Sequence, residues 1–130
     1  MHPSIRKLLS YATSESSLSD EYLKYLSLDS RKLLAIEESG NFIAFVGIKI
    51  LKENECEIKH IAVDPIERNR GLESYMINFI CEKYNFKKIT AETDFEAVNF
   101  YKNYGFTVTS LGEKYPGIER FKCEYYCGHR

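Results

Sequence analysis

The stretch Glu55–Tyr84, ECEIKHIAVDPIERNRGLESYMINFICEKY, decides the fold, because it predicts a strand, a turn rich in hydrogen-bond donors and an amphipathic helix in succession. Residues 56–63 suit a mostly buried strand, and their β-branched side chains favour extended structure. Asp64-Pro65 ends this strand, since proline has no N–H for a ladder hydrogen bond. Apolar residues then recur at helical spacing from Leu72 to Tyr84.

The turn between this strand and this helix has the chemistry of a phosphate site. Gly71 lets a ligand approach the backbone closely, and the free N–H groups and positive dipole end of the helix favour an anion. Arg68 and Arg70 add two positive charges at the same place. The glycine spacings of a Walker A loop and of a dinucleotide fingerprint are both absent. We therefore interpret residues 68–74 as a phosphate cradle of another kind.

Two segments resemble motifs of the GNAT N-acetyltransferase superfamily. Ile61–Pro65 followed by Arg68–Leu72 (RNRGL) is similar to the family's acetyl-CoA motif, Gln/Arg-x-x-Gly-x-Gly/Ala after a strand. The later segment TDFEAVNFYKNYGF, residues 93–106, resembles the family's helix motif Asn-x-x-Ala-x-x-Phe/Leu-Tyr-x-x-x-Gly-Phe. There are two departures: Glu73 stands where the family usually has its last Gly or Ala, and Asp94 stands where Asn is common.

The resemblance and the order of predicted elements together imply an α/β fold, with a mixed, mostly antiparallel sheet of about six strands flanked by helices. One domain is expected over residues 1–130. Helices are predicted at residues 4–11, in the run capped by Ser19 or Asp20, and at 96–104; further strands are predicted at residues 31–37, 42–51, 87–93, 106–111 and 120–126. Family members commonly begin with a strand, for which this sequence has no room, so the first strand is expected to be missing or short.

The resemblance implies direct attack of a primary amine on acetyl-CoA, with acetyl-CoA as co-substrate and no metal. Glu57 is the first candidate for the base, because a carboxylate within a largely apolar strand should have a raised pKa. Strand alternation predicts Glu57 on the face of Ile61 and Val63, and His60, the second candidate, on the other face. The structural alternatives are a surface charge paired with a neighbouring lysine for Glu57, and a hydrogen-bonded core histidine for His60.

Tyr101 is the candidate general acid, at the position where the family's tyrosine protonates the leaving thiolate; its alternative is an aromatic packed in the core. The backbone N–H of Val63 is the expected oxyanion donor. Two orientations of the Glu73 side chain are left open: near the phosphate, which its charge would repel, or towards solvent while its N–H still binds. The expected acetyl-CoA contacts are Ile61, Ala62, Val63, Arg68, Asn69, Arg70, Gly71, Leu72, Glu73, Ser74, Asp94 and Ala97.

Composition limits the other partners. The net charge of −1 provides no general field for nucleic acid, and no apolar run reaches the length of a membrane span, so a cytoplasmic protein is expected. The four cysteines are interpreted as small reduced thiols rather than a disulfide framework or a zinc site. The amine acceptor is not identified and a homodimer is left open. The rival hypothesis is a degenerate GNAT domain that binds CoA or an acyl-CoA without catalysis.

Overall fold

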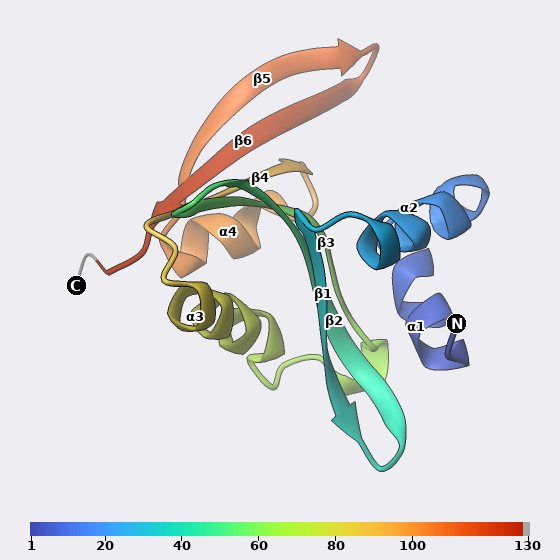
Figure 1. The fold of residues 1–130 in the computed structure, drawn as a ribbon. Helices are drawn as coiled ribbons and strands as arrows, with labels where there is room; N and C mark the ends of the chain where they lie inside the picture. Colours follow the sequence, from blue (N-terminus) through green and yellow to red (C-terminus); the bar gives the residue numbers. More distant parts are fainter. Residues whose placement is uncertain (129–130) are drawn as a thin grey trace.

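The computed structural model describes residues 1–128, so residues 129 and 130 of the predicted domain lie outside the described part. Two helices come first, followed by a six-stranded sheet with order β1-β2-β3-β4-β6-β5 (Figure 1). Only β3 and β4 pair in parallel. The elements are α1 (Pro3–Ser10), α2 (Glu15–Ser27), β1 (Arg31–Glu38), β2 (Asn41–Lys52), β3 (Glu55–Val63), a 3-10 turn (Pro65–Glu67), α3 (Leu72–Tyr84), β4 (Lys88–Asp94), α4 (Val98–Tyr104), β5 (Thr107–Tyr115) and β6 (Ile118–Tyr126).

This architecture confirms the predicted fold class, and no strand precedes α1 within residues 1–128. Helices α3 and α4 cover one face of the sheet, while α1 and α2 cover the other face at the β1–β3 end (Figure 1). Strand β2 is apolar on both faces because it lies between these layers. Val46 and Ile48 pack in the cluster beside α3, whereas Phe45 packs in the cluster beside α1.

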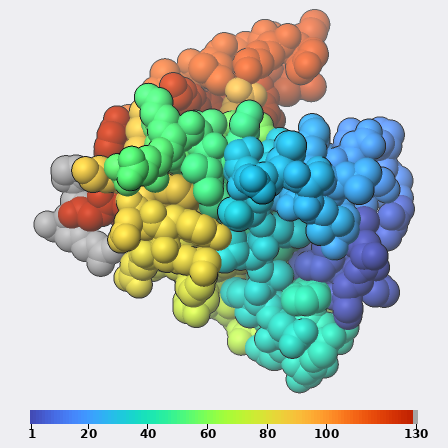
Figure 2. All heavy atoms as spheres, in the orientation of Figure 1, coloured from blue at the N-terminus to red at the C-terminus, as the bar shows by residue number. Residues whose placement is uncertain are grey.

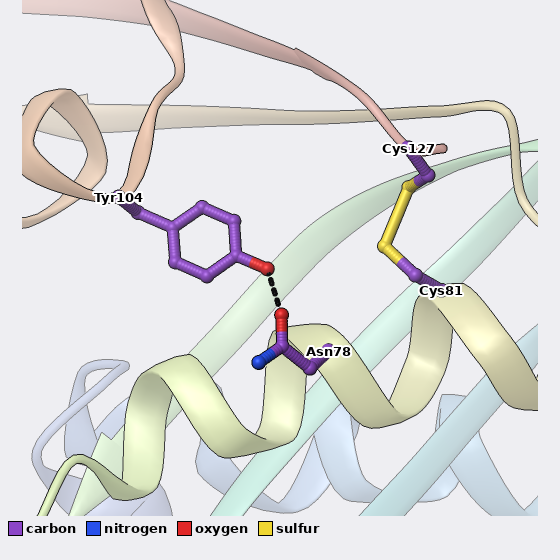
Figure 3. The surroundings of a disulfide bond; sticks show 4 residues. All are labelled: Asn78, Cys81, Tyr104 and Cys127. Carbon is purple, nitrogen blue, oxygen red and sulfur yellow. Dashed lines mark hydrogen bonds between the residues drawn. A yellow bond between two sulfur atoms is a disulfide. The ribbon is translucent and has the colours of Figure 1, made fainter. Parts of the chain in front are cut away.

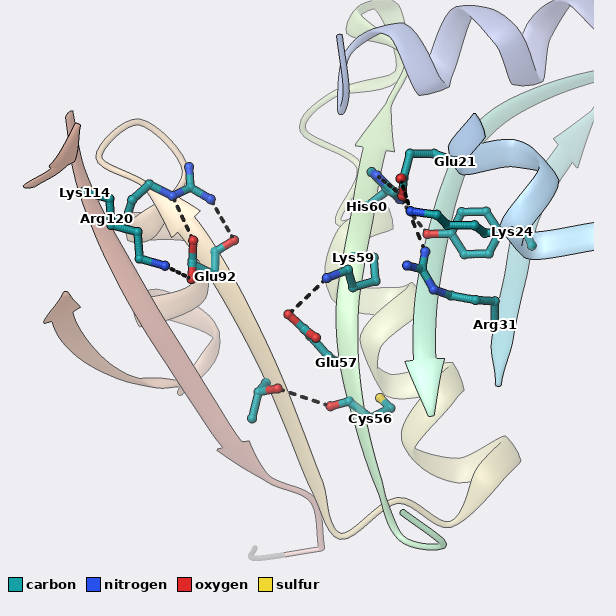
Figure 4. A network of polar contacts seen from close by, with 12 residues as sticks. Glu21, Lys24, Arg31, Cys56, Glu57, Lys59, His60, Glu92, Lys114 and Arg120 are labelled. Atoms are coloured by element: carbon teal, nitrogen blue, oxygen red, sulfur yellow. Dashed lines mark hydrogen bonds and ion pairs between the residues drawn. The ribbon is translucent and has the colours of Figure 1, made fainter. Parts of the chain in front are cut away.

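Strand β3 contains a β-bulge that changes which side chains share a face. Its partner on β2 pairs Gly47 with His60 and then Ile48 with Ile58, so Lys59 is an extra residue. Simple alternation, which placed Glu57 with Ile61 and opposite His60, is therefore wrong. The bulge puts Glu57 and His60 on the same face of the sheet, with His60 beside Glu21 of α2 and Glu57 beside Lys59 (Figure 4).

Two predicted boundaries also need correction. Helix α2 begins at Glu15 with Ser14 as its N-cap residue, earlier than expected, because Leu18 of the serine-rich run is fully buried in the core and fixes that turn. Residues 112–119, which separate the strands predicted at 106–111 and 120–126, are mostly strand, since β5 and β6 continue pairing to a tight turn with Gly117 at φ 78°.

The interpretation of all four cysteines as reduced thiols is wrong for one pair. Cys81 on α3 and Cys127, after β6, form a disulfide across 46 residues of sequence (Figure 3). They meet because the Cys127 backbone N–H donates to Lys87 O at 2.9 Å, which holds the end of β6 beside the segment that follows α3. Cys56 and Cys123 are free and buried, as expected. None of the helices in the described part of the chain is long and apolar enough to cross a membrane.

Candidate active site

A groove opens where β3 and β4 separate. The two strands pair only between residues 55–58 and 88–91, and beyond these residues they diverge (Figure 4). The resulting cavity measures about 500 Å3. It is lined by Tyr11, Ala12, Ile58, Lys59, His60, Ile61, Ala62, Val63, Arg68, Glu73, Glu92, Thr93, Asp94, Glu96, Ala97, Phe100, Tyr101 and Arg120. The groove thus brings the strand of the first motif and the helix of the second to one place.

The predicted phosphate cradle divides into residues that line the groove and residues that do not. Asn69 and Gly71 adopt left-handed backbone conformations, with φ of 69° and 72°, and Gly71 is the N-cap residue of α3. Arg68 lines the groove. Arg70 instead forms ion pairs with Glu67 and, at 3.1 Å, with Glu38. Its charge is therefore partly neutralised outside the groove.

The remaining cradle residues behave differently from one another. Glu73 is half-buried in the groove wall, which favours the orientation in which its carboxylate opposes a phosphate. Burial raises its pKa, against the opposing effect of Arg68. Leu72 packs against the core beside α3, whereas Ser74 is half-buried without lining the groove. The Glu73 carboxylate has thus lost hydration, and no hydrogen bond or ion pair joins it to another residue among residues 1–128.

Tyr101 lies at the groove with its ring held by the core. Only 5% of the residue is exposed, and Phe100 and Phe106 contact its ring edge to face at 5.3 and 5.1 Å. Burial raises the pKa of its phenol, with smaller contributions from Cys123 and Glu73. No hydrogen bond joins the hydroxyl to another residue in the described range 1–128. The phenol thus stays protonated and has its donor available.

The turn before α4 forms another part of the groove. The Asp94 side chain accepts a hydrogen bond from the Ala97 backbone N–H at 2.9 Å, and both residues line the groove. This contact gives Asp94 a local structural role that asparagine would also fill. The departure from the family motif is therefore conservative in shape, although it adds a negative charge.

His60 lines the groove, but its ring is held by α2. The Tyr25 hydroxyl and His60 Nδ1 are 2.6 Å apart, and Nε2 lies 3.6 Å from Glu21 Oε1 (Figure 4). Burial lowers the pKa of the imidazole, while Glu21 opposes that effect. The guanidinium of Arg31 lies over the Tyr25 ring at 5.4 Å. Nδ1 is thus hydrogen-bonded to α2, whereas Nε2 is only near Glu21, beyond hydrogen-bond distance. This arrangement fits a hydrogen-bonded core histidine.

Glu57 lies on the same face, beside the groove but not among its lining residues. Its carboxylate is 3.5 Å from Lys59 Nζ, and 28% of its side chain is exposed (Figure 4). The bulge at Lys59 brings the two side chains together. Glu57 thus has a water-accessible carboxylate with a cationic neighbour, rather than the apolar surroundings predicted for it.

Sequence reasoning missed a cationic cluster at the far wall. Glu92 pairs with Lys114 at 2.8 Å and with Arg120 at 3.2 Å, joining β4, β5 and β6 (Figure 4). These contacts lower the pKa of Glu92. The alternating pattern of β4 places Glu92 opposite Ala91 and Thr93, but its partners depend on strand register, which the sequence leaves open.

The family of the chain follows from its comparison with protein-family models, which agrees with the fold and the groove described above. Residues 3–106 match the model of the acetyltransferase (GNAT) family. The chain therefore belongs to that family.

Particular relatives are more distant. An uncharacterized N-acetyltransferase of Bacillus methanolicus, from the lysA 3′ region, is 28% identical over 85 residues, covering 63% of this chain and 71% of that protein. A GNAT acetyltransferase from Elizabethkingia anophelis, solved with acetyl-CoA bound, superposes with a TM-score of 0.71 at 20% identity, covering 92% and 88% of the two chains. The Escherichia coli ribosomal-protein-S18-alanine N-acetyltransferase gives a TM-score of 0.78 at 16% identity, covering 95% and 86%.

Proposed function

We propose that the protein is an acetyl-CoA-dependent N-acetyltransferase that transfers the acetyl group to a primary amine by direct attack. The observation that carries this proposal is the Tyr101 hydroxyl, protonated and without a hydrogen-bond partner among the described residues, at a groove that starts beside the N-terminus of α3. The Elizabethkingia relative was solved with acetyl-CoA, and the Bacillus methanolicus relative is named as an N-acetyltransferase.

The proposed binding mode follows from the two ends of the groove. The pyrophosphate of acetyl-CoA would bind the backbone N–H groups at the start of α3, with Arg68 as the cation nearest the groove. The pantetheine arm would bind along Ile61–Val63, where β3 has no strand partner on the β4 side. That unpaired backbone supplies N–H donors, and the Val63 N–H is our candidate for the oxyanion.

Tyr101 is the proposed general acid. As the C–S bond breaks, the thiolate takes the phenolic proton, and the raised phenol pKa prevents its loss before that moment. The amine must lose one proton when the amide forms. We assign that proton to Glu57, directly or through a water molecule, because its carboxylate is accessible, whereas His60 is buried and its Nδ1 is hydrogen-bonded to Tyr25 of α2.

The rival reading is a domain that binds CoA without catalysis. Glu73 supports it, since a half-buried carboxylate in the groove wall repels a pyrophosphate. The two readings differ in turnover rather than in binding.

The test is a thiol-release assay with acetyl-CoA and a panel of primary amines, together with calorimetry of CoA binding. Tyr101→Phe should lower kcat by about 10²-fold or more while leaving CoA affinity within about twofold. Tyr104→Phe is the matched control. It removes a tyrosine hydroxyl from the same helix, but that hydroxyl donates a hydrogen bond to Asn78. Tight CoA binding with no turnover of any amine would favour the binding domain, and no CoA binding at all would exclude both readings.

A further inference from the structure

Strand β1 is one of the two edges of the sheet, and its sequence is complementary to itself. It reads RKLLAIEE from Arg31 to Glu38, with basic residues at the start and acidic residues at the end. Its ladder with β2 shifts register after Ile36, but the extra residue there, Ile43, lies on β2. Strand β1 therefore alternates regularly along its length.

Alternation sorts these side chains between the two faces of the sheet. Leu34 and Ile36 pack against the cluster beside α3. Lys32 and Glu38 share that face, since side chains alternate along the strand and both residues are even-numbered. No ion pair joins Lys32 to another residue within the described part of the chain, whereas Glu38 contacts Arg70 at 3.1 Å.

We propose that β1 pairs with β1 of a second copy of this chain, in antiparallel orientation about a two-fold axis through Ala35. An axis normal to the sheet keeps the corresponding faces of the two copies on the same side. Even-numbered residues of one β1 strand must therefore lie opposite even-numbered residues of the other, and odd opposite odd. With the axis at Ala35, the residue numbers of each cross-strand pair add up to 70. Lys32 then lies opposite Glu38 and Leu34 opposite Ile36, and each pair occurs twice by symmetry. Ala35, which is exposed, meets its own copy.

The surroundings of β1 fit the same partner. On the α3 side, a groove of about 450 Å3 runs between β1 and α3, lined in part by Tyr75 and Phe79. These two rings are stacked at 6.5 Å, and 59% and 44% of the two residues are exposed. A continuous sheet would place the α3 helices of both copies on one side, where Tyr75 and Phe79 would be covered.

The other side of β1 also has exposed apolar side chains beside it. Leu26 and Leu28, at the end of α2, are exposed and line a second groove that reaches Leu33 of β1. Figure 2 shows α3 in yellow and the end of α2 in blue on either side of the β1 segment. The strand edge is thus flanked by apolar surface on both faces, with charge pairs at its two ends. This inference does not depend on the proposed catalytic function.

The test uses charge reversal, with sedimentation velocity over a range of concentrations as the readout. The wild type should dimerise. Lys32→Glu and Glu38→Lys each replace two attractive cross-strand pairs with like charges, so each variant alone should raise the dimer dissociation constant on the order of tenfold. An equimolar mixture of the two variants restores both pairs and should form heterodimers with near wild-type affinity. Lys102→Glu, the same charge change on exposed α4, should have no effect.

Circular dichroism of each variant establishes that it is folded. A wild type that stays monomeric at millimolar concentration would overturn the proposal. So would a dimer whose dissociation constant is the same in Lys32→Glu, Glu38→Lys and wild type, because that dimer would use another surface. Failure of the mixture to recover the dimer would refute the antiparallel register.

Discussion

Gly47 provides the sharpest test of the packing around His60. It lies in the middle of β2, opposite His60, where an added Cβ would be 2.1 Å from the Tyr25 hydroxyl oxygen and 2.4 Å from Cζ. Its φ is outside the left-handed region, so Gly47→Ala introduces a steric conflict without backbone strain. The Tyr25 ring must move, which also breaks its 2.6 Å hydrogen bond to His60.

The expected loss follows from these two effects. Overpacking of a tight core costs about 1–3 kcal/mol, and loss of a buried hydrogen bond adds ~1 kcal/mol. Gly47→Ala should therefore lower the free energy of unfolding by about 2–4 kcal/mol and the Tm by roughly 10 °C. Chemical denaturation followed by circular dichroism measures the first quantity, and thermal denaturation the second.

The decisive comparison is a double-mutant cycle with Tyr25→Leu. Leucine lacks the atoms that the new methyl group would meet, so Gly47→Ala should then be neutral or stabilising, since alanine suits a strand interior better than glycine by ~0.5–1 kcal/mol. If Gly47→Ala costs the same in both backgrounds, the Tyr25 contact is not the cause and the reasoning fails.

Three further variants test the site and the crosslink. Glu73→Gln should tighten CoA binding about fivefold at neutral pH, equivalent to ~1 kcal/mol. Because the pKa of Glu73 is raised, the difference in affinity between the variant and wild type should disappear as the pH falls below that pKa. Calorimetry at several pH values measures both effects, and equal affinities throughout would mean that the carboxylate does not face the ligand. Glu57→Gln should lower kcat/KM at neutral pH but less at high pH, where free amine is abundant, and a wild-type pH–rate profile would transfer the proton to water or His60. Cys81→Ser should lower the free energy of unfolding by about 4 kcal/mol under oxidising conditions, because the disulfide no longer restricts a 46-residue loop of the unfolded chain. Reductant should cause the same loss in wild type and leave Cys81→Ser unchanged. Equal stability of the two proteins under oxidising conditions would refute this prediction.

The sequence predicts those parts of the site that depend on local spacing. Gly71 marks the start of α3 by itself, because the left-handed conformation and the helix that follows are both local properties. Tyr101 is found through the resemblance of residues 93–106 to the family's helix motif, which is likewise a pattern of local spacing. The same local reasoning fails at Glu57, because one extra residue in β3 puts it on the face of His60 rather than on that of Ile61 and Val63.

Contacts between distant segments are beyond such reasoning. The pairing of Cys81 with Cys127 requires the end of β6 to lie beside α3, which is a consequence of strand order. The three-membered contact of Glu92 with Lys114 and Arg120 likewise depends on how β5 and β6 are aligned. Hydrophobic patterning specifies faces within one strand, but the alignment of neighbouring strands depends on turns and bulges.

The short parallel ladder between β3 and β4 gives the molecule the form of two half-sheets with a hinge. Strands β1–β3 form one half and β4–β6 the other, joined by four residue pairs at residues 55–58. The ties near this closed end include the hydrogen bond from Lys87 N to Asn54 O at 2.7 Å and the Cys81–Cys127 crosslink. Small rotations about that end would change the width of the groove most at its open mouth. A ligand that contacts both half-sheets would therefore restrict their rotation relative to each other, and its binding should make the whole sheet more rigid.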